Sequence, residues 1–502
     1  MIDRLIHLLA YHPQEPLIFS SGLFLFLFLG FSFIYMLLQQ RLNARLVFVT
    51  LFSYYFYYKS SGLYFWLLAV VTVSDFFIAR SIQRLADGAA ADATRASRAR
   101  RWRKALVALS LLIDLGLLGY FKYTNFFAGM VSQLLEHNFQ PWDIFLPVGI
   151  SFFTFQSLSY TIDVYRGNLK PLSHLLDYAF YVSFFPQLVA GPIVRAADFA
   201  PQIRCPLVIT NDMFARGVYF ILIGLFKKAV ISDYISLNFV DRIFDNPTLY
   251  SGLENLLGVY GYALQIYCDF SGYSDMAIGI ALLLGFHFPI NFNAPYRSVS
   301  ITDFWRRWHI SLSTWIRDYI YISLGGNRKG KLRQYVNLVI TMLLGGLWHG
   351  ASLNFVAWGG AHGIALAVHK FFRQEVLHHG RGFQSHGVRK WIAIVLTFHF
   401  VCFTWIFFRQ KTFTAGWTML RQIFFNFHAE LWQQVCAGYQ YVLAFMAFGY
   451  LTHFLPDAWQ EGIIAQLRRC NVVVYALLLT AAIYMVIQVK SSTIQPFIYF
   501  QF

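Results

Sequence analysis

Residues 336–350 read VNLVITMLLGGLWHG, an uncharged apolar run with a helical period that ends at a histidine. Such a run is typical of a helix that lies in hydrocarbon. An imidazole at that depth costs free energy unless the ring has a partner or a function. We therefore expect a membrane helix at 336–348, and His349 is the first candidate functional residue.

The rest of the chain has the same apolar character. Of its 502 residues, 57% are hydrophobic and 19% aromatic, and only 13% are charged, whereas soluble proteins carry roughly 25% charged residues. These values predict an all-α polytopic membrane protein. About eleven crossings are expected, with the remaining apolar segments forming re-entrant or interfacial helices. The candidate segments are Leu17–Leu38, Leu46–Tyr58, Leu63–Ala79, Ala105–Phe121, Phe145–Ile162, Tyr178–Ile193, Phe214–Ile231, Leu253–Asp269, Ser274–Phe288, Val336–Trp348, Leu353–Val368, Trp391–Phe408, Tyr441–Leu455 and Val472–Ile487.

The formal net charge is +16, and the cations lie in short loops between apolar segments. The positive-inside rule accounts for that pattern, so no nucleic-acid partner is expected. Six cations in residues 95–104 place that loop in the cytoplasm, while the cation-free residues 137–143 are expected on the outer side. We expect an N-terminal extension at 1–16 and one integral membrane domain at 17–502.

Residues 298–334 are too polar to span a membrane but are rich in aromatic residues. Ser300 is a candidate N-cap, with Asp303 in the first turn. One apolar helical face is formed by Trp305, Trp308, Leu312 and Trp315. This pattern predicts an interfacial amphipathic helix on the cytoplasmic side, and a plain membrane-surface anchor would fit it equally.

Two histidines are candidates for chemistry. His349 lies between Gly345-Gly346 and Gly350, where a backbone can approach a ligand closely. An imidazole kept neutral by desolvation is a suitable general base, although a buried histidine often only bonds a neighbouring carbonyl. His309 ends the aromatic and basic segment 304–309, where it could orient a second substrate, tune His349 or cap the surface helix.

Several polar residues lie inside apolar segments. Gln265, Asp269 and Asp275 are close together, and a carboxylate at membrane depth faces a water-filled path or pairs with a cation. For both aspartates a buried salt bridge is the simpler interpretation. Gln187 and Pro192 indicate a broken helix beside a polar cavity.

Some chemistries find no support in the sequence. It contains no phosphate-binding GxxxxGK[ST] loop, no GxSxG nucleophile elbow and no HExxH zinc motif. The five cysteines are far apart and lack metal-ligand spacing, so we expect neither a metal nor a disulfide framework.

Several ordered segments together resemble the membrane-bound O-acyltransferase (MBOAT) family, in particular its bacterial alginate O-acetyltransferase-like branch. They are LPVGISFFTFQ (146–156), PQLVAGP (186–192), QIYCDFSGYSD (265–275), FWRRWH (304–309), RDYIYI (317–322), GGNR (325–328), LWHG (347–350) and PFIYFQF (496–502). The resemblance runs from about residue 17 to the end of the chain, and the extension 1–16 departs from it.

This resemblance implies a ring of tilted helices around a central tunnel. It implies that His349 is the catalytic histidine and His309 a second, more variable polar position. It further implies transfer of an acyl group from a cytoplasmic thioester, usually acetyl-CoA, to a hydroxyl of an extracytoplasmic polysaccharide such as alginate. A periplasmic SGNH-like partner or a polysaccharide synthesis complex would assist, and the location would be the bacterial inner membrane.

Around these histidines, further residues are candidates for substrate binding. Arg306 and Arg307 could attract the phosphates of acetyl-CoA, although lipid headgroups would attract the same residues. Asn354 could serve as an oxyanion donor. The other members of this set are Trp305, Trp348, Gln265 and Asp269. No bound cofactor is expected, since the acyl thioester is a substrate.

Other functions fit parts of the same pattern. Within the family, the group could be D-alanine on teichoic acid, or the acceptor could be peptidoglycan. A polysaccharide or lipid transporter would also use intramembrane carboxylates, but the chain shows no inverted halves. A non-catalytic scaffold for a synthase is the remaining alternative.

Overall fold

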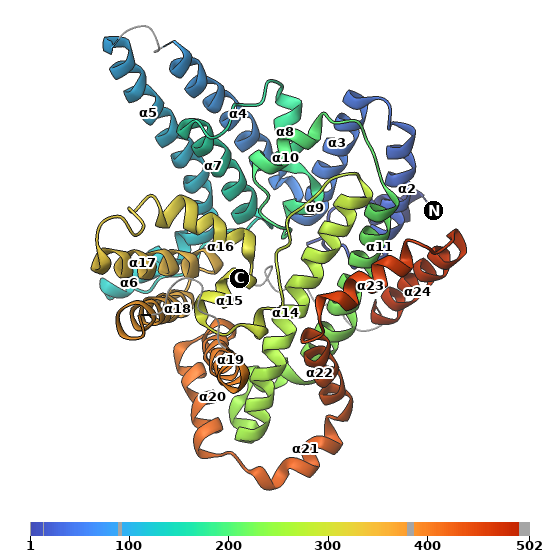
Figure 1. Ribbon diagram of the computed structural model, residues 1–502, viewed down its shortest axis with the longest axis vertical. Helices are drawn as coiled ribbons and strands as arrows, with labels where there is room; N and C mark the ends of the chain where they lie inside the picture. Colours follow the sequence, from blue (N-terminus) through green and yellow to red (C-terminus); the bar gives the residue numbers. More distant parts are fainter. Residues whose placement is uncertain (1, 14, 89–92, 379–385, 491–502) are drawn as a thin grey trace. The chain divides into compact units, whose positions relative to one another are not determined.

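The structure is a computed structural model that describes residues 2–13, 15–88, 93–378 and 386–490. Throughout this part of the chain it consists of helices and connecting loops, with no strand (Figure 1). The all-α prediction is therefore confirmed. The terminal segment 496–502, which contributed to the resemblance, lies outside the described residues.

The chain divides into two compact units, which we describe separately. Unit 1 comprises Met1–Val218 and Ala277–Pro289, and unit 2 comprises Tyr219–Met276 and Ile290–Phe502. The helices α11 (Asn211–Leu225) and α14 (Gly252–Leu283) each run from one unit into the other. The expectation of a single membrane domain at 17–502 stays a prediction.

The remaining helices of unit 1 are α1 (Ile2–Leu9), α2 (Gly22–Leu37), α3 (Leu42–Ser61), α4 (Phe65–Asp87), α5 (Ala93–Leu118), α6 (Thr124–Leu134), α7 (Ile150–Arg166), α8 (Leu175–Ser183), α9 (Phe185–Leu188) and α10 (Ala196–Ile203), with η1 (Gly62–Tyr64) and η2 (Gly119–Tyr123). Inside this unit α4 packs on α5, α7 and α8. Lys59 of α3 donates to the carbonyl oxygens of Leu8 (3.1 Å) and Ala10 (2.5 Å), so the N-terminal extension is bonded to α3.

The remaining helices of unit 2 are α12 (Asp233–Ile235), α13 (Asp241–Asp245), α15 (Ile301–Arg307), α16 (Ile310–Ile316), α17 (Lys331–His349), α18 (Leu353–Phe371), α19 (Gly387–Arg409), α20 (Phe413–Phe425), α21 (Trp432–Gly438), α22 (Gln440–His453), α23 (Asp457–Leu467) and α24 (Val472–Lys490). Its short 3₁₀ and π segments are η3 (Phe226–Ser232), η4 (Ser236–Val240), η5 (Pro247–Leu249), η6 (Pro295–Arg297), η7 (Arg317–Tyr321), η8 (Phe372–Val376) and η9 (Ala429–Leu431).

Among the described residues, three helical stretches are long and apolar enough to cross a membrane: Leu42–Asp87, Arg95–Leu134 and Gly387–Arg409. A fourth is possible if the bent pair Ala429–Gly438 and Gln440–His453 counts as one span. The expected number of about eleven crossings is not confirmed, since other apolar helices such as α2 are short.

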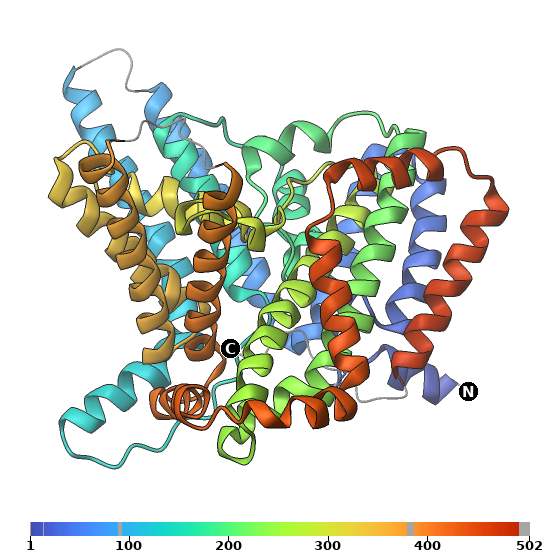
Figure 2. The ribbon, with the colours of Figure 1, turned by 60° about the horizontal axis from the view of Figure 1, so that its bottom comes forward.

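Two predicted segment boundaries differ from the structure. The segments expected at 253–269 and 274–288 form the single helix α14, which Figure 2 shows as continuous. Gly272 does not break it, because a Cβ there would lie 2.7 Å from the carbonyl oxygen of Gly224, so the glycine permits close helix packing. The predicted break near Gln187 does occur, between α8 and α9.

The predicted interfacial helix is broken into α15, α16 and η7. Its N-cap is confirmed, since Ser300 Oγ accepts a hydrogen bond from the backbone N–H of Asp303 at 3.2 Å. Its apolar face, however, is only 1–8% exposed at Trp305, Trp308, Leu312 and Trp315. That face packs inside the protein, so the expectation of a face that lies on lipid was wrong.

Candidate active site

His349 is the last residue of α17, where the helix gives way to the extended backbone of Gly350. Helix α17 packs closely along α18, because a Cβ at Gly346 would lie 2.1 Å from the carbonyl oxygen of Phe355, and one at Gly359 2.2 Å from that of Met342. Small residues of this kind let helices approach. Gly346 therefore serves helix packing, and not the ligand approach that the sequence suggested.

The ring of His349 lies among aromatic side chains and is 3% exposed. Its centroid is 5.0 Å from that of Trp348, 5.2 Å from Trp358 and 5.4 Å from Phe408, with ring planes close to perpendicular. We call these residues and His309, whose ring lies 6.4 Å from that of His349, the histidine cluster. It brings the two histidines together from α17 and from the start of α16.

His309 is completely buried, and it is the N-cap residue of α16. Its backbone has φ 42° and ψ 56°, the left-handed conformation that residues other than glycine seldom adopt. Its ring lies edge-on to Phe270 at 4.6 Å and 5.9 Å from Trp348. Burial lowers the pKa of His309 well below its usual value, so this imidazole is neutral at physiological pH.

Asn291 bonds the two residues that follow His309 in the chain. Its carbonyl oxygen accepts from the N–H of Ile310 at 2.9 Å, and its Oδ1 accepts from the N–H and the hydroxyl of Ser311 at 3.2 and 2.9 Å. Its Nδ2 donates to Ser274 Oγ at 3.2 Å. A left-handed residue persists only where its surroundings hold it there, and Asn291 supplies part of that restraint.

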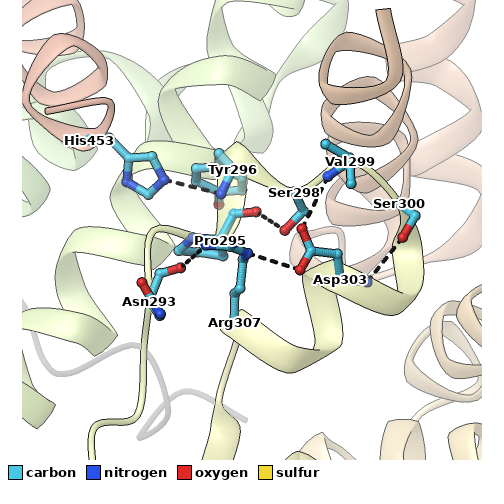
Figure 3. A network of polar contacts seen from close by, with 9 residues as sticks. All are labelled: Asn293, Pro295, Tyr296, Ser298, Val299, Ser300, Asp303, Arg307 and His453. Atoms are coloured by element: carbon cyan, nitrogen blue, oxygen red, sulfur yellow. Dashed lines mark hydrogen bonds and ion pairs between the residues drawn. The ribbon is translucent and has the colours of Figure 1, made fainter. Parts of the chain in front are cut away.

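A second set of polar contacts holds the chain before His309 (Figure 3). Arg307 donates to Asp303 Oδ1 at 3.0 Å and to the carbonyl of Asn293 at 3.3 Å, while the N–H of Asn293 donates to the carbonyl of Arg307 at 2.9 Å. His453 of α22 accepts from the N–H of Tyr296 at 3.1 Å. Arg307 is thus bonded within the protein, whereas the neighbouring Arg306 is exposed.

Trp305 belongs to a different set of contacts, around a third buried histidine. Its Nε1 donates to His362 Nδ1 at 3.3 Å, and His362 Nε2 lies 3.0 Å from Thr404 Oγ1. Both ring nitrogens of His362 therefore have partners, which indicates a structural role. The sequence reasoning missed His362, and its position one turn after Trp358 on α18 was the available signal.

Asn354 does not act as a free amide beside His349. Its Nδ2 donates to the carbonyl of Gln410 at 2.7 Å, and Gln410 Nε2 donates to the carbonyl of Phe244 at 2.9 Å. Next to it, Arg409 forms a 2.9 Å ion pair with Asp241. These bonds fix the end of α19, which carries Phe408 of the histidine cluster.

Asp269 and Gln265 lie on α14 in a charged neighbourhood that we call the lysine cluster. Lys228 pairs with Asp269 at 2.6 Å and with Asp233 at 2.8 Å, and all three are buried. Gln265 Nε2 donates to Ser236 Oγ at 2.9 Å. Asp275 pairs with Lys227 at 2.7 Å. Both aspartates thus form the salt bridges that were the simpler interpretation.

Of the sequence candidates, ring contacts join His349, His309 and Trp348 directly. Trp358 contacts both Trp305 and His349 and so connects the two rings. The partners of Arg307, Asn354, Gln265 and Asp269 are protein groups. Buried aromatic rings surround the neutral imidazole of His309, and polar interactions are stronger in apolar surroundings of this kind than in water.

Comparison with known proteins identifies the family of the chain. Residues 53–409 match the family described as MBOAT, the membrane-bound O-acyltransferases. The chain is 43% identical to a probable alginate O-acetylase of Pseudomonas aeruginosa over 81% of its length and 75% of that protein. It is 38% identical to a probable alginate O-acetylase of Pseudomonas putida over 97% and 100%, and 38% identical to a peptidoglycan O-acetyltransferase of Helicobacter pylori over 81% and 79%.

The matched range contains both histidines of the cluster and most of the helices that hold them. The apolar helices and the family together identify a membrane protein. The chain belongs to the membrane-bound O-acyltransferase family and is an O-acyltransferase.

Proposed function

We propose that the protein moves an acetyl group from a cytoplasmic thioester, acetyl-CoA, to hydroxyls of an extracytoplasmic polysaccharide. The observation that carries the proposal is the buried cluster that pairs His349 with a neutral His309 in a chain of this enzyme family. Acetyl is favoured because the relatives described above are named O-acetylases and an O-acetyltransferase.

In the proposed reaction His349 acts as general base. It takes the proton of the acceptor hydroxyl while that oxygen attacks the thioester carbonyl. The carbon–sulfur bond breaks, and the departing thiolate receives the proton from His349. General-base catalysis of this kind contributes about 10²–10⁴-fold, and positioning two substrates in a dry site adds more. A covalent acyl-histidine is an alternative route through the same ring.

His309 is the second polar group of the proposed site. Its ring centroid lies 6.4 Å from that of His349, so the two imidazoles are close neighbours in the cluster. We assign it to orienting the acceptor. The two imidazoles are then a base and a hydrogen-bonding partner, which requires both to be uncharged before the reaction.

The donor would approach from the basic side of the membrane. Arg306 is exposed and could attract the phosphates of acetyl-CoA, whereas Arg307 is already paired with Asp303. A central tunnel would connect the two compartments. The bacterial inner membrane, and a periplasmic SGNH-like enzyme or synthesis complex that receives the acetyl group, complete the proposal.

The test uses the purified full-length chain in lipid vesicles with acetyl-CoA labelled in the acetyl group. Transfer of label to an alginate or peptidoglycan acceptor, in the presence of the periplasmic partner, supports the proposal. Label from a D-alanyl carrier protein but not from acetyl-CoA would favour teichoic acid chemistry. Polysaccharide export without label transfer would favour a transporter, and no activity of either kind a scaffold.

A further inference from the structure

Unit 1 contains a pair of carboxyl groups that are buried among its packed helices and do not belong to the histidine cluster. Asp75 lies on α4 and Asp114 on α5, and neither is exposed. Both lie in stretches long and apolar enough to cross a membrane. An ionisable group at that depth requires a partner.

Two serine hydroxyl groups bond Asp75. Ser110 of α5 donates to its Oδ1 at 2.7 Å, and Ser157 of α7 donates to its Oδ2. The hydroxyl of Tyr178 on α8 lies 2.7 Å from Ser157 Oγ, so it donates to the serine and extends the series. Donors on both oxygens are the surroundings of an ionised carboxylate.

Asp114 has the opposite surroundings. Neither of its oxygens accepts a hydrogen bond from any described group, although its carboxyl group faces Asp75 within hydrogen-bonding reach. No described lysine or arginine pairs with either aspartate. Two facing acceptors with no donor between them repel, unless one of them carries a proton.

We infer that Asp75 and Asp114 form a proton-binding site, in which Asp114 is a neutral carboxylic acid that donates its proton to ionised Asp75. The bound proton removes one of two buried charges and supplies the missing hydrogen bond. The site then joins α4, α5, α7 and α8 through one anion that accepts three hydrogen bonds. A monovalent cation in place of the proton is the competing occupant.

Other titratable groups near the pair have partners of their own. Tyr160 of α7 accepts from the N–H of Leu172 at 2.9 Å, and Arg80 of α4 donates to the carbonyl of Ser173 at 2.8 Å. Tyr178 is bonded to Ser157 as described. The nearby buried Asp177 differs, since Arg204 binds both its oxygens at 2.7 and 2.9 Å, and it makes a matched control.

Infrared spectroscopy of the purified full-length protein reads the proton directly. The wild type at neutral pH should show the C=O stretch of a protonated carboxylic acid. Asp114→Asn should lose that band, and Asp177→Asn should keep it. A wild type without the band, or a band that survives in Asp114→Asn, would overturn the inference.

Thermal unfolding gives a second measurement. Aspartates of the unfolded chain release their protons below neutral pH, so the folded chain binds one proton more, and its stability falls as pH rises. The wild-type midpoint should therefore fall as the pH rises from about 4, and the fall should be shallower in Asp114→Asn, because the amide donates without titrating. A wild-type midpoint that responds to sodium but not to pH would show that the site binds a cation and not a proton.

The assignment of the proton to Asp114 has its own test. Asp75→Asn removes the anion that three donors require, so this variant should unfold at a lower temperature than Asp114→Asn at neutral pH. Equal midpoints for the two variants would contradict the asymmetry. None of these measurements uses acyl transfer, so they stand apart from the proposed function.

Discussion

The histidine cluster and the lysine cluster of unit 2 are both buried, but their polar groups have different neighbours. Around His349 and His309 the neighbours are aromatic rings, and burial keeps His309 uncharged. Around Lys228 the neighbours are carboxylates, and buried charges meet at 2.6 and 2.8 Å. Both use helix α14, which carries Phe270 against His309 and Asp269 against Lys228.

Under the proposed function the two clusters have different roles, catalysis for the histidine cluster and structural support for the lysine cluster. In the proposed mechanism an uncharged imidazole accepts a proton, whereas each group of a buried ion pair already has a charged partner. We therefore expect variants of the histidine cluster to lose activity while they keep their fold. Variants of the lysine cluster should lose stability first.

The largest effect is expected from His349→Ala. Loss of the general base should lower acyl transfer by about 10²–10⁴-fold, with normal amounts of protein in the membrane. The matched control is His362→Gln, a buried histidine whose two ring nitrogens bond Trp305 and Thr404. It should cost about 1–3 kcal/mol of stability and leave the activity of the folded protein near normal. Initial rates of transfer from labelled acetyl-CoA measure both, and an active His349→Ala enzyme would remove this ring from the mechanism.

Lys228→Ala should have the next largest effect, on the other side of the comparison. It leaves Asp233 and Asp269 buried without their cation, a change that costs about 3–5 kcal/mol. Thermal unfolding in detergent measures it. Lys331→Ala is the control, because its ion pair with Glu375 lies at the surface and the lysine is 71% exposed. Equal melting temperatures for the two variants would mean that the lysine cluster is not a support.

Local patterns in the sequence are enough to predict much of this architecture. The composition predicts the all-α class, and Ser300 with Asp303 predicts the start of α15, since a cap depends only on neighbours within one turn. The position of His349 at the end of an apolar helix is equally local. The positions of Trp348 and His349 at the end of α17 are therefore predictable from residues that are adjacent in the chain.

Partners from distant segments could not be predicted in the same way. Lys228 and Asp269 are forty-one residues apart, and neither segment contains a pattern that identifies the other as its partner. The helix is interrupted at His309, and Asn291 bonds the backbone there. The spacing of apolar residues in the sequence gives no sign of those bonds. The burial of the Trp305 to Trp315 face is tertiary too, because an amphipathic face fits lipid and protein equally well.

Asn291→Ala should have a moderate effect that sharpens the boundary of the histidine cluster. Without its hydrogen bonds to Ser311 the left-handed backbone of His309 loses a restraint, and a small shift of the ring should lower kcat roughly tenfold. The KM for acetyl-CoA should change little. Asn255→Ala is the control, since that buried amide bonds the carbonyls of Pro247, Tyr250 and Ser251 instead. A loss of kcat that is equal in both variants would indicate a general loss of structure and not positioning of His309.

The smallest effect is expected from Arg306→Ala. This variant tests whether a charged residue outside both clusters attracts acetyl-CoA. Arg306 is exposed, so its attraction for the phosphates of acetyl-CoA is screened by salt. The KM for acetyl-CoA should rise about threefold at low ionic strength and return to the wild-type value at high ionic strength. Arg307→Ala should instead lower the melting temperature, because its guanidinium bonds Asp303 and Asn293. The measurement belongs in a neutral detergent, where no anionic headgroup competes with the donor. A KM that is unaffected there at any salt concentration would leave Arg306 to the membrane surface and the recognition of the donor to other residues.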